Sequence, residues 1–262
     1  MEDVKLVLLD LDGTLLDEKS KVPVEFYDLV IKLREKRVNV GIASGRNKSS
    51  LEVVFGDLFN QMACITNNGC ANFIDGNMIS ADYLDPEVCE KLLNKADEDP
   101  NISFQLFFPD YILMKEGNPL IEMLNGIGFK AKPCSNLKEH FKDGVVLVSL
   151  IDQSKKDHIE EFSHLGGDYK MVTPGLGVID ITPGHVSKAY GADRLAQKLN
   201  ISVDQIMALG DAGNDLALLE HVGYPVAMKN GMEEVKKKAK YITKYTNIEH
   251  GAIRFLEEFF EL

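Results

Sequence analysis

The sequence lacks any apolar run of the length that a membrane-spanning helix needs. Such a helix takes about 20 consecutive apolar residues, and no stretch of the 262-residue chain approaches this. The first residues, Met1, Glu2 and Asp3, include two acids, where a secretory signal would begin with basic residues and continue with an apolar segment. With 45% apolar and 27% charged residues, the composition is typical of a globular protein. We therefore expect a cytoplasmic location and no membrane partner.

Basic residues and cysteines are also scarce. Lysine and arginine number 29 against 41 for aspartate and glutamate, which gives a net charge of -12. Proteins that bind nucleic acid neutralise many phosphates with basic side chains, so nucleic acid is not expected as the main partner. The four cysteines form no C-x-x-C pair, and a chain of this length can bury a core without disulfides. We expect all four to be reduced and buried: Cys64, Cys70, Cys89 and Cys134.

Several catalytic motifs are missing. Residues 41–45 read G-I-A-S-G, which places the serine one position too late for the G-x-S-x-G nucleophile elbow. There is no G-x-x-x-x-G-K-[ST] loop, and no G-x-G-x-x-G follows the first apolar run. The six histidines include no H-E-x-x-H pair, and Gly13 follows Asp10 too closely for an EF-hand loop. These absences disfavour P-loop, dinucleotide-binding, zinc and EF-hand functions.

What the sequence does contain is an alternation of short apolar runs and amphipathic segments. Residues 5–9 and 38–43 are nearly unbroken apolar runs, typical of buried parallel strands. Between them, residues 24–36 repeat apolar side chains with the 3.6-residue period of a helix. The alternation resumes near the end of the chain, with helices expected at 187–199, 213–220, 232–239 and 252–260 and strands at 205–209, 225–228 and 241–243. This pattern predicts a doubly wound, Rossmann-like parallel sheet formed by residues 1–81 and 184–262.

The segment 82–183 has a different character and predicts an inserted α/β cap domain. A helix is expected from Asp85-Pro86, where a good N-cap residue precedes a proline at the first helical position. Turn-forming residues are dense between the apolar runs of this segment. We expect strands at 102–108, 111–115, 145–151 and 177–181, and helices after Asn118-Pro119 and at 155–165. Just before the insertion, Asp75-Gly76 predicts a hairpin between residues 72–74 and 77–79.

Polar residues follow three of the expected core strands: Asp10 and Asp12, then Ser44, then Asp211, Asn214 and Asp215. In an open parallel sheet, ligands bind beyond the carboxyl ends of the strands, near the point where strand order reverses. Carboxylates crowded at such an edge repel one another, and a hard divalent cation relieves that repulsion. The sequence therefore predicts a Mg²⁺ site that accepts an anionic substrate, with phosphate as the obvious group.

Four motifs in this order resemble those of the haloacid dehalogenase-like phosphatases: Asp10-Leu11-Asp12-Gly13-Thr14, Ser44-Gly45-Arg46, Lys188 and Gly210-Asp211-Ala212-Gly213-Asn214-Asp215. The insertion resembles the large α/β cap of the Cof-type subfamily, which includes sugar-phosphate phosphatases. The resemblance runs nearly from end to end of the chain. It implies a Mg²⁺-dependent phosphatase that acts on small phosphorylated metabolites through an aspartyl-phosphate.

The resemblance also implies a role for each motif residue. Asp10 resembles the nucleophile and Asp12 the general acid/base, while the carboxylates of Asp10 and Asp211 and the backbone carbonyl of Asp12 resemble the metal ligands. Asp215 resembles a second acidic partner, either near the metal or orienting Lys188. The phosphate-binding set corresponds to Ser44, the amides of Leu11 and Gly45, Lys188 and Asn214, and Thr14 and Arg46 are supporting residues.

Each motif taken singly has a plainer interpretation. Asp12-Gly13 is an ordinary turn dipeptide, and Ser44 could simply cap a following helix. Lys188 could be one more solvated helix lysine, and Asp211 and Asp215 could be first-turn acids favoured by the helix dipole. Four such coincidences at one sheet edge are improbable, which favours the functional interpretation. The role of Arg46 stays open between substrate contact and surface pairing.

Two other functions remain as alternatives. A sugar phosphomutase of the same superfamily would use the same residues, and a requirement for a bisphosphate would distinguish it. A receiver-type signalling module also uses a Mg²⁺-bound phosphorylatable aspartate, a hydroxyl residue and a lysine on a doubly wound sheet. Receivers are compact, whereas the motifs of this chain are spread across an inserted domain. The sequence does not indicate the oligomeric state.

Overall fold

The computed structural model of the protein describes residues 3–175 and 177–262, which form two compact units. The first unit, here called the core, comprises the segment that ends at Gly45 together with Val54–Ser80 and Ser187–Leu262. The second, here called the cap, comprises Arg46–Val53 and Ala81–Val186. The segment Arg46–Val53 groups with the cap, although the sequence analysis placed it in the core. Among the described residues, no helix is both long and apolar enough to cross a bilayer.

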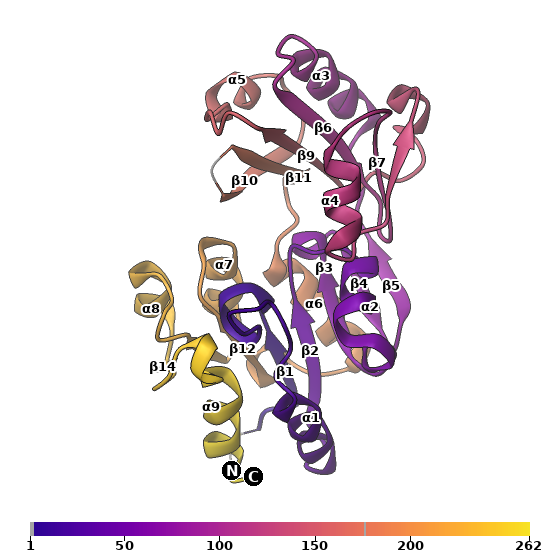
Figure 1. Ribbon diagram of the computed structural model, residues 1–262. Helices are drawn as coiled ribbons and strands as arrows, with labels where there is room; N and C mark the ends of the chain where they lie inside the picture. Colours follow the sequence, from indigo (N-terminus) through magenta and orange to yellow (C-terminus); the bar gives the residue numbers. More distant parts are fainter. Residues whose placement is uncertain (1–2, 176) are drawn as a thin grey trace. The chain divides into compact units, whose positions relative to one another are not determined.

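The core is built on an eight-stranded sheet in the described part of the chain, with strand order β14-β13-β12-β1-β2-β3-β4-β5. Neighbouring strands run parallel from β14 to β3, and β4 is antiparallel to β3. Figure 1 shows β1 with β2 and β12 beside it. The strands are β1 Leu6–Leu9, β2 Asn39–Ala43, β3 Ala63–Thr66, β4 Ala71–Ile74, β5 Asn77–Ala81, β12 Ile206–Gly210, β13 Tyr224–Ala227 and β14 Tyr241–Ile242. This is the predicted doubly wound fold.

The order of these strands sets where a ligand site belongs. From β1 the chain proceeds through β2 and β3 to one side, and it later returns through β12, β13 and β14 on the other side of β1. Strand order therefore reverses between β1 and β12, whose residues Leu6 and Ile206 are paired. In doubly wound sheets, ligands bind beyond the carboxyl ends of strands at such a point, and here those ends lead into Asp10 and Asp211.

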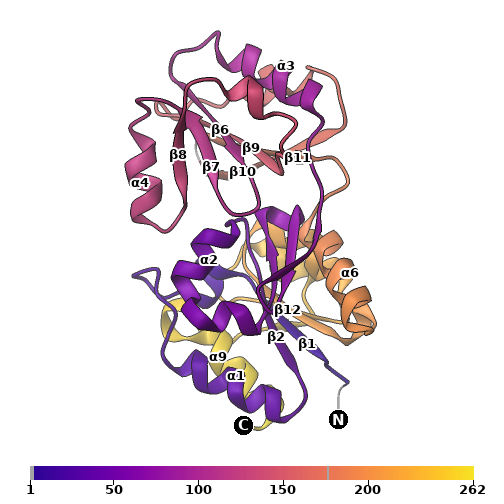
Figure 2. The ribbon, with the colours of Figure 1, turned by 90° about the vertical axis from the view of Figure 1, so that its right-hand side faces the viewer.

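Helices cover both faces of the core sheet, which explains why β1 is buried along its whole length. Figure 2 shows α1 and α9 on one face and α6 on the other. On the α6 face, Ala192 and Leu195 pack in one apolar cluster with Leu6, Leu8 and Ile206. The helices are α1 Glu25–Glu35, α6 Lys188–Leu199, α7 Leu216–His221, α8 Glu233–Lys238 and α9 Gly251–Phe260.

The cap contains a six-stranded sheet in the described part of the chain, with order β10-β11-β9-β6-β7-β8. Only the pair β7–β8 is parallel among the neighbouring strands described there. One face of the sheet packs against α3, with Phe104, Leu106, Val88 and Leu92 in a single apolar cluster. Helix α2, Lys48–Phe55, begins in the cap segment and ends in the core. The other cap elements are α3 Pro86–Ala96, α4 Leu120–Gly126, α5 Ile159–Ser163, β6 Ile102–Phe107, β7 Ile112–Lys115, β8 Ala131–Cys134, β9 Leu147–Asp152, β10 Tyr169–Gly175 and β11 Val178–Pro183.

Several local sequence signals have the expected structure. The Asp85 side chain accepts a hydrogen bond from the amide of Glu87, and Pro86 begins α3. In the β4–β5 hairpin, Asp75 and Gly76 both have positive φ, 50° and 74°, as a two-residue hairpin turn requires.

The sequence analysis overlooked α2, β8 and β10, and it misjudged one cysteine. Both overlooked strands lie at the edges of the cap sheet. Each contains a proline, Pro133 in β8 and Pro174 in β10, and edge strands lack the continuous apolar run by which buried strands are recognised. All four cysteines are free and three are buried, whereas Cys134 in β8 is half-buried.

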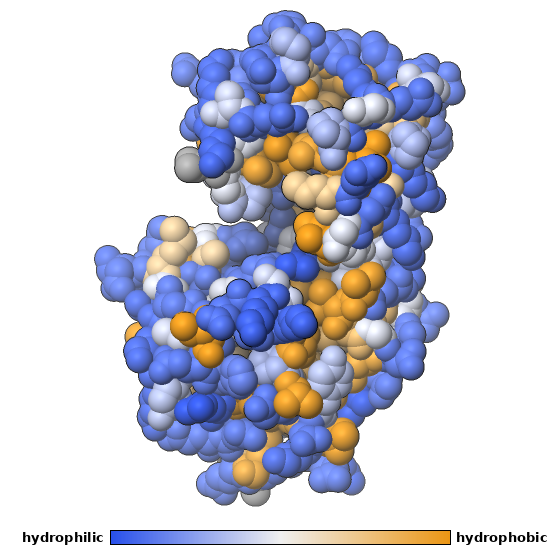
Figure 3. Space-filling model, viewed as in Figure 1, coloured by the Kyte–Doolittle hydropathy of each residue, from blue (hydrophilic) through white to orange (hydrophobic). Residues whose placement is uncertain are grey.

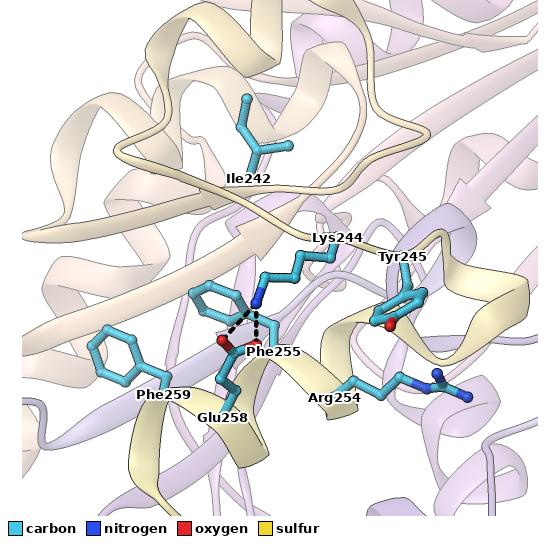
Figure 4. Close-up of a pocket in the computed structure, with 7 residues that line it drawn as sticks. All are labelled: Ile242, Lys244, Tyr245, Arg254, Phe255, Glu258 and Phe259. Atoms are coloured by element: carbon cyan, nitrogen blue, oxygen red, sulfur yellow. Dashed lines mark hydrogen bonds and ion pairs between the residues drawn. The ribbon is translucent and has the colours of Figure 1, made fainter.

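Figure 3 shows that hydrophilic side chains dominate the visible face of each unit, with apolar side chains gathered where Figure 1 draws the cap strands β9 and β11. A cavity of about 300 Å³ lies in the core beside β14 and α9. Figure 4 shows its lining, including Phe255, Phe259 and the ion pair between Lys244 and Glu258. None of the motif residues lines this cavity. Asp10 and Asp211 instead follow the carboxyl ends of β1 and β12.

Candidate active site

Asp10 lies directly beyond β1, where the sequence analysis placed it. Its backbone amide donates to the carbonyl of Leu209 at 3.0 Å, which continues the pairing of β1 with β12. The side chain is buried, whereas Asp12 is exposed. Two carboxylates two residues apart therefore have different surroundings, one protected from water and one open to it.

Glycine is required at position 13 because the backbone there passes close to the side chain of Asp211. Its φ of 87° lies in the left-handed region, and a Cβ atom there would lie 2.4 Å from Oδ2 of Asp211. The carbonyl of Gly13 accepts a hydrogen bond of 2.8 Å from Nδ2 of Asn230. A side chain at position 13 would thus both strain the backbone and displace Asp211.

Lys188 is buried between two carboxylates. Its Nζ lies 2.7 Å from Oδ1 of Asp10 and 2.6 Å from Oδ1 of Asp215, and the residue is only 1% exposed. It is the first residue of α6, after the N-cap Ser187, whose side chain accepts from the amide of Tyr190. The interpretation of Lys188 as a solvated helix lysine is therefore wrong, because the start of α6 directs this side chain into the core.

Asp215 uses both of its oxygens within the site. While Oδ1 accepts from Lys188, Oδ2 accepts from the amides of Asp211 and Ala212 at 3.0 and 3.1 Å. A Cβ at Gly210 would lie 2.5 Å from the carboxyl carbon of Asp215, so glycine is needed there for this packing. Of the two roles left open for Asp215, the geometry supports the one in which it orients Lys188.

Asp211 is held by the turn that follows β1. The hydroxyl of Thr14 donates to Oδ1 of Asp211 at 2.9 Å, which joins residues almost 200 positions apart in the sequence. Thr14 thus fixes one oxygen of the Asp211 carboxylate, as Lys188 fixes one oxygen of Asp10.

The site carries more negative than positive charge, which is the condition for a bound cation. Carboxylate oxygens of Asp10, Asp211 and Asp215 lie within 4.8 Å of one another, and Lys188 is the cation that pairs with two of them. Burial raises the pKa of Asp10, with the negative charges of Asp215 and Asp211 adding to the effect and Lys188 opposing it. Burial likewise raises the pKa of Asp211 to about 6, against the hydrogen bond from Thr14. Since oxygen ligands in an acidic site suit Mg²⁺, these residues fit that ion.

Ser44 and Gly45 follow β2, and Asn68, which follows β3, connects them to Asn214 beyond β12. The carbonyl of Ser44 accepts from the amide of Asn68 at 3.1 Å, and Oδ1 of Asn68 accepts from Nδ2 of Asn214 at 3.3 Å. A Cβ at Gly45 would lie 3.2 Å from Oδ1 of Asn68. Asn68 thus links the second motif to the fourth. Arg46 directly follows Gly45 and begins the segment that groups with the cap.

Asn67 and Asn68 are residues of this edge that the sequence analysis did not select. Both have positive φ, 50° and 57°, which asparagine tolerates better than most residues. Asn67 is fully buried, yet neither Oδ1 nor Nδ2 of its side chain has a hydrogen-bond partner in the described residues. An unpaired buried amide costs about 1–3 kcal/mol, so a polar ligand or water is expected beside it. The signal for both was the Asn67-Asn68-Gly69 run, which directly follows the short apolar stretch of residues 63–66.

The chain matches known proteins over nearly its full length. The family model described as haloacid dehalogenase-like hydrolase matches residues 7–256. The 5-amino-6-(5-phospho-D-ribitylamino)uracil phosphatase YwtE of Bacillus subtilis is 27% identical, over 97% of this chain and 98% of that protein. The HMP-PP phosphatase of Klebsiella pneumoniae is 24% identical, over 95% and 93%. The solved structure of BT1666, a phosphatase from Bacteroides thetaiotaomicron, superimposes with a TM-score of 0.82 at 25% identity, over 100% of this chain and 97% of that one. The chain belongs to the haloacid dehalogenase-like hydrolase family and is a phosphatase of its Cof type.

Proposed function

We propose that this phosphatase hydrolyses small phosphomonoesters, sugar phosphates among them, with Mg²⁺ and through an aspartyl-phosphate on Asp10. The observation that carries the proposal is the pairing of buried Asp10 with Lys188 at the point where strand order reverses. A buried carboxylate held by a buried cation at that edge is a preorganised nucleophile facing the position where ligands bind.

The proposed reaction uses the two aspartates in turn. A carboxylate oxygen of Asp10 attacks phosphorus and forms a P–O bond, while the bond from phosphorus to the leaving alcohol breaks. Asp12 gives its proton to the departing oxygen and then takes a proton from the water that cleaves the aspartyl-phosphate. The exposed position of Asp12 supports this role, since it lets the side chain exchange protons with solvent.

The remaining residues would bind the metal, orient the nucleophile and stabilise the negative charge of the phosphoryl group. Asp10, Asp211 and the carbonyl of Asp12 would bind Mg²⁺, which neutralises the carboxylates and the negative charge of the phosphoryl group. Lys188 holds Asp10 in place, and Asp215 holds Lys188. Ser44, Asn214 and the amides of Leu11 and Gly45 would donate hydrogen bonds to phosphoryl oxygens, as charge stabilisation at the transferring group requires. Asp215 and Thr14 would keep this set aligned.

The substrate class is proposed from two considerations. Residues 82–183 supply none of the groups proposed for phosphate chemistry, so we assign them the choice of leaving group. The name of the relative YwtE describes a phosphate carried by a ribityl chain, a small polyhydroxylated alcohol. We extend that class to this chain and place the reaction in the cytoplasm.

A panel of metabolite phosphates tests the function. Purified protein with Mg²⁺ is incubated with sugar, polyol, nucleotide and aryl phosphates, and released phosphate is measured. Hydrolysis of one or more small esters is expected, without any requirement for a bisphosphate. Phosphate transfer that depends on a bisphosphate would indicate a mutase instead, and phosphorylation of the protein without turnover would indicate a receiver-like function.

A further inference from the structure

The cavity of about 300 Å³ beside β14 and α9 shares no residue with the candidate active site. Its lining comes from β14, from the segment that follows this strand and from one side of α9, all within the core. In the described part of the chain, β14 is the outer strand of the core sheet. Pockets that hold ligands have volumes of about 300–1,000 Å³, and this cavity, at the lower end of that range, suits a small molecule.

Aromatic and aliphatic side chains give the cavity apolar walls. Phe255 and Phe259, one turn apart on α9, stack with their ring centroids 5.8 Å apart, and both are only half-buried. Figure 4 shows Ile242 and Tyr245 on the opposite side of the lining from α9. Ile242 is 51% exposed and Tyr245 is 38% exposed. An aromatic ring that displaced water from these surfaces would bind favourably.

The charged side chains in and around the lining leave one positive charge in excess. Both carboxylate oxygens of Glu258 pair with Lys244, at 2.6 and 2.8 Å. The charge of Arg254 lowers the pKa of Glu249, but the carboxylate of Glu249 has its own ion pair with Lys229 at 4.0 Å. Arg254 is therefore the cation whose charge no neighbouring acid balances by a direct ion pair among the described residues. The excess is local, because the whole chain carries a net charge of -12.

Arg254 is held in a position that suits the binding of a carboxylate. Its guanidinium carbon lies 4.7 Å from the centroid of the Tyr245 ring, and Figure 4 shows these two side chains together at one end of the lining. Such stacking uses the face of the guanidinium, whereas its five N–H donors lie at the edge. In the part of the chain that the structure describes, those donors form no hydrogen bond. Their fork geometry matches the two oxygens of a carboxylate.

We propose that this cavity binds an aromatic monocarboxylate, with its ring against Phe255 and Phe259 and its carboxylate on Arg254. A single negative charge balances the excess positive charge of the lining. A phosphate dianion would instead place an unbalanced negative charge near Glu258, and a neutral aromatic molecule would leave the donors of Arg254 unused. The inference goes beyond the proposed phosphatase reaction and does not depend on it.

The test measures the binding of three probes to the full-length protein. Hydrocinnamate carries the ring and the charge, hydrocinnamamide carries the ring alone, and propanoate carries the charge alone. NMR shifts of the backbone amides locate the binding site, and titration gives each Kd. Sedimentation velocity measures the oligomeric state. No phosphate ester is present, so failure of the proposed hydrolysis would not affect the result.

Two variants of the lining are compared with matched controls. Arg254→Gln removes the proposed carboxylate-binding group, and Ile242→Thr removes apolar surface while it keeps a β-branched residue in β14. Arg37→Gln and Ile127→Thr make the same changes at exposed positions outside the lining. Since all four residues are exposed, each variant should fold, and thermal unfolding verifies this.

We expect wild type to bind hydrocinnamate with shifts in the amides of β14, the segment after it and α9. It should bind hydrocinnamamide and propanoate about tenfold more weakly. Arg254→Gln should weaken hydrocinnamate about tenfold and bind the acid and the amide alike. Ile242→Thr should weaken both ring-bearing probes about fourfold, and the two controls should resemble wild type.

Several results would overturn the proposal. Equal Kd values of wild type for the acid and the amide would show that the cavity does not select a carboxylate. Hydrocinnamate binding that Arg254→Gln leaves unchanged, or that shifts no amide of α9, would place the acid elsewhere on the protein. Self-association of wild type that Ile242→Thr abolishes would identify a second copy of the chain as the occupant.

Discussion

In the core, the side chain of Lys188 pairs with the carboxylates of Asp10 and Asp215, and Asp211 lies beside them. All four side chains are ionisable groups, although they come from distant parts of the chain. In the cap, the side chains that gather are apolar: Phe104, Leu106, Val88 and Leu92 pack in one cluster between the sheet and α3. The first arrangement suits a doubly charged phosphoryl group, whose transfer depends on electrostatic stabilisation. The second stabilises the cap by burying apolar surface and supplies none of the charged groups that meet in the core. Changes in the core should therefore act on every substrate, and changes in the cap should act selectively.

The largest effect is expected for Asp10→Asn. The amide keeps the shape of the side chain but loses the nucleophile and its negative charge, so turnover should fall by about 10⁴-fold or more on every ester. Phosphate release measures the rate, and circular dichroism with thermal unfolding checks the fold. A folded Asp10→Asn protein with near wild-type turnover would show that another residue attacks phosphorus.

Removal of metal should also act on all substrates alike. EDTA should abolish phosphate release, Mg²⁺ should restore it, and Ca²⁺ should restore it poorly, because its larger radius and looser coordination misalign the reacting groups. The measurement is activity after dialysis and metal addition. Full activity in EDTA would contradict the metal assignment to Asp10 and Asp211, and substrate-selective loss would break the contrast between core and cap.

Asp12→Asn is expected to reduce turnover by about 10²- to 10⁴-fold, the usual contribution of a general acid/base. The loss should be greatest for sugar phosphates, whose alkoxide needs a proton, and smaller for an aryl phosphate with a good leaving group. A loss below about tenfold on a sugar phosphate would mean that another group supplies the proton. Since Asp12 is exposed, the unfolding temperature should stay unchanged.

Lys188→Met should destabilise the core as well as inactivate it. The substitution leaves Asp10 and Asp215 buried without their shared cation, and breaking a buried pair in this way costs about 3–5 kcal/mol. Lys198→Met is the matched control, because Lys198 is exposed on the same helix. Urea unfolding measures both free energies. Equal stability of the two variants would show that the ion network contributes nothing to folding.

The smallest effect is a pH dependence of cap stability. His158 is buried; burial by itself lowers its pKa, but hydrogen bonds to Asp152 and Glu161 raise it above the ordinary 6.5. A histidine whose pKa is higher in the folded than in the unfolded state stabilises the protein fully at pH values below its unfolded-state pKa. This stabilisation is lost as the pH rises through the folded-state pKa. The free energy of unfolding should therefore fall from about pH 6.5 upward. His158→Gln should flatten that fall, and exposed His164→Gln should leave it unchanged.

Much of the fold was predictable because its signals are local. The apolar run of β1 and the capping residues of α3 lie within a few positions of the structures that they specify. The edge strands β8 and β10 escaped prediction because a half-exposed strand with a proline has no continuous apolar pattern. The short helix α2 escaped too, and its segment Arg46–Val53 groups with the cap through contacts that no local pattern encodes.

The sequence by itself determined the fold class, the order of the four motifs and the identity of the acids, because periodicity and spacing are properties of a short stretch of chain. Tertiary structure decided the rest. It buried Lys188 between Asp10 and Asp215 rather than in solvent, joined Thr14 to Asp211, and left buried polar atoms of Asn67, Gln105 and Thr182 without a hydrogen-bond partner among the described residues. Burial and pairing depend on which distant segments meet, and the packing of sheets and helices alone brings those segments together.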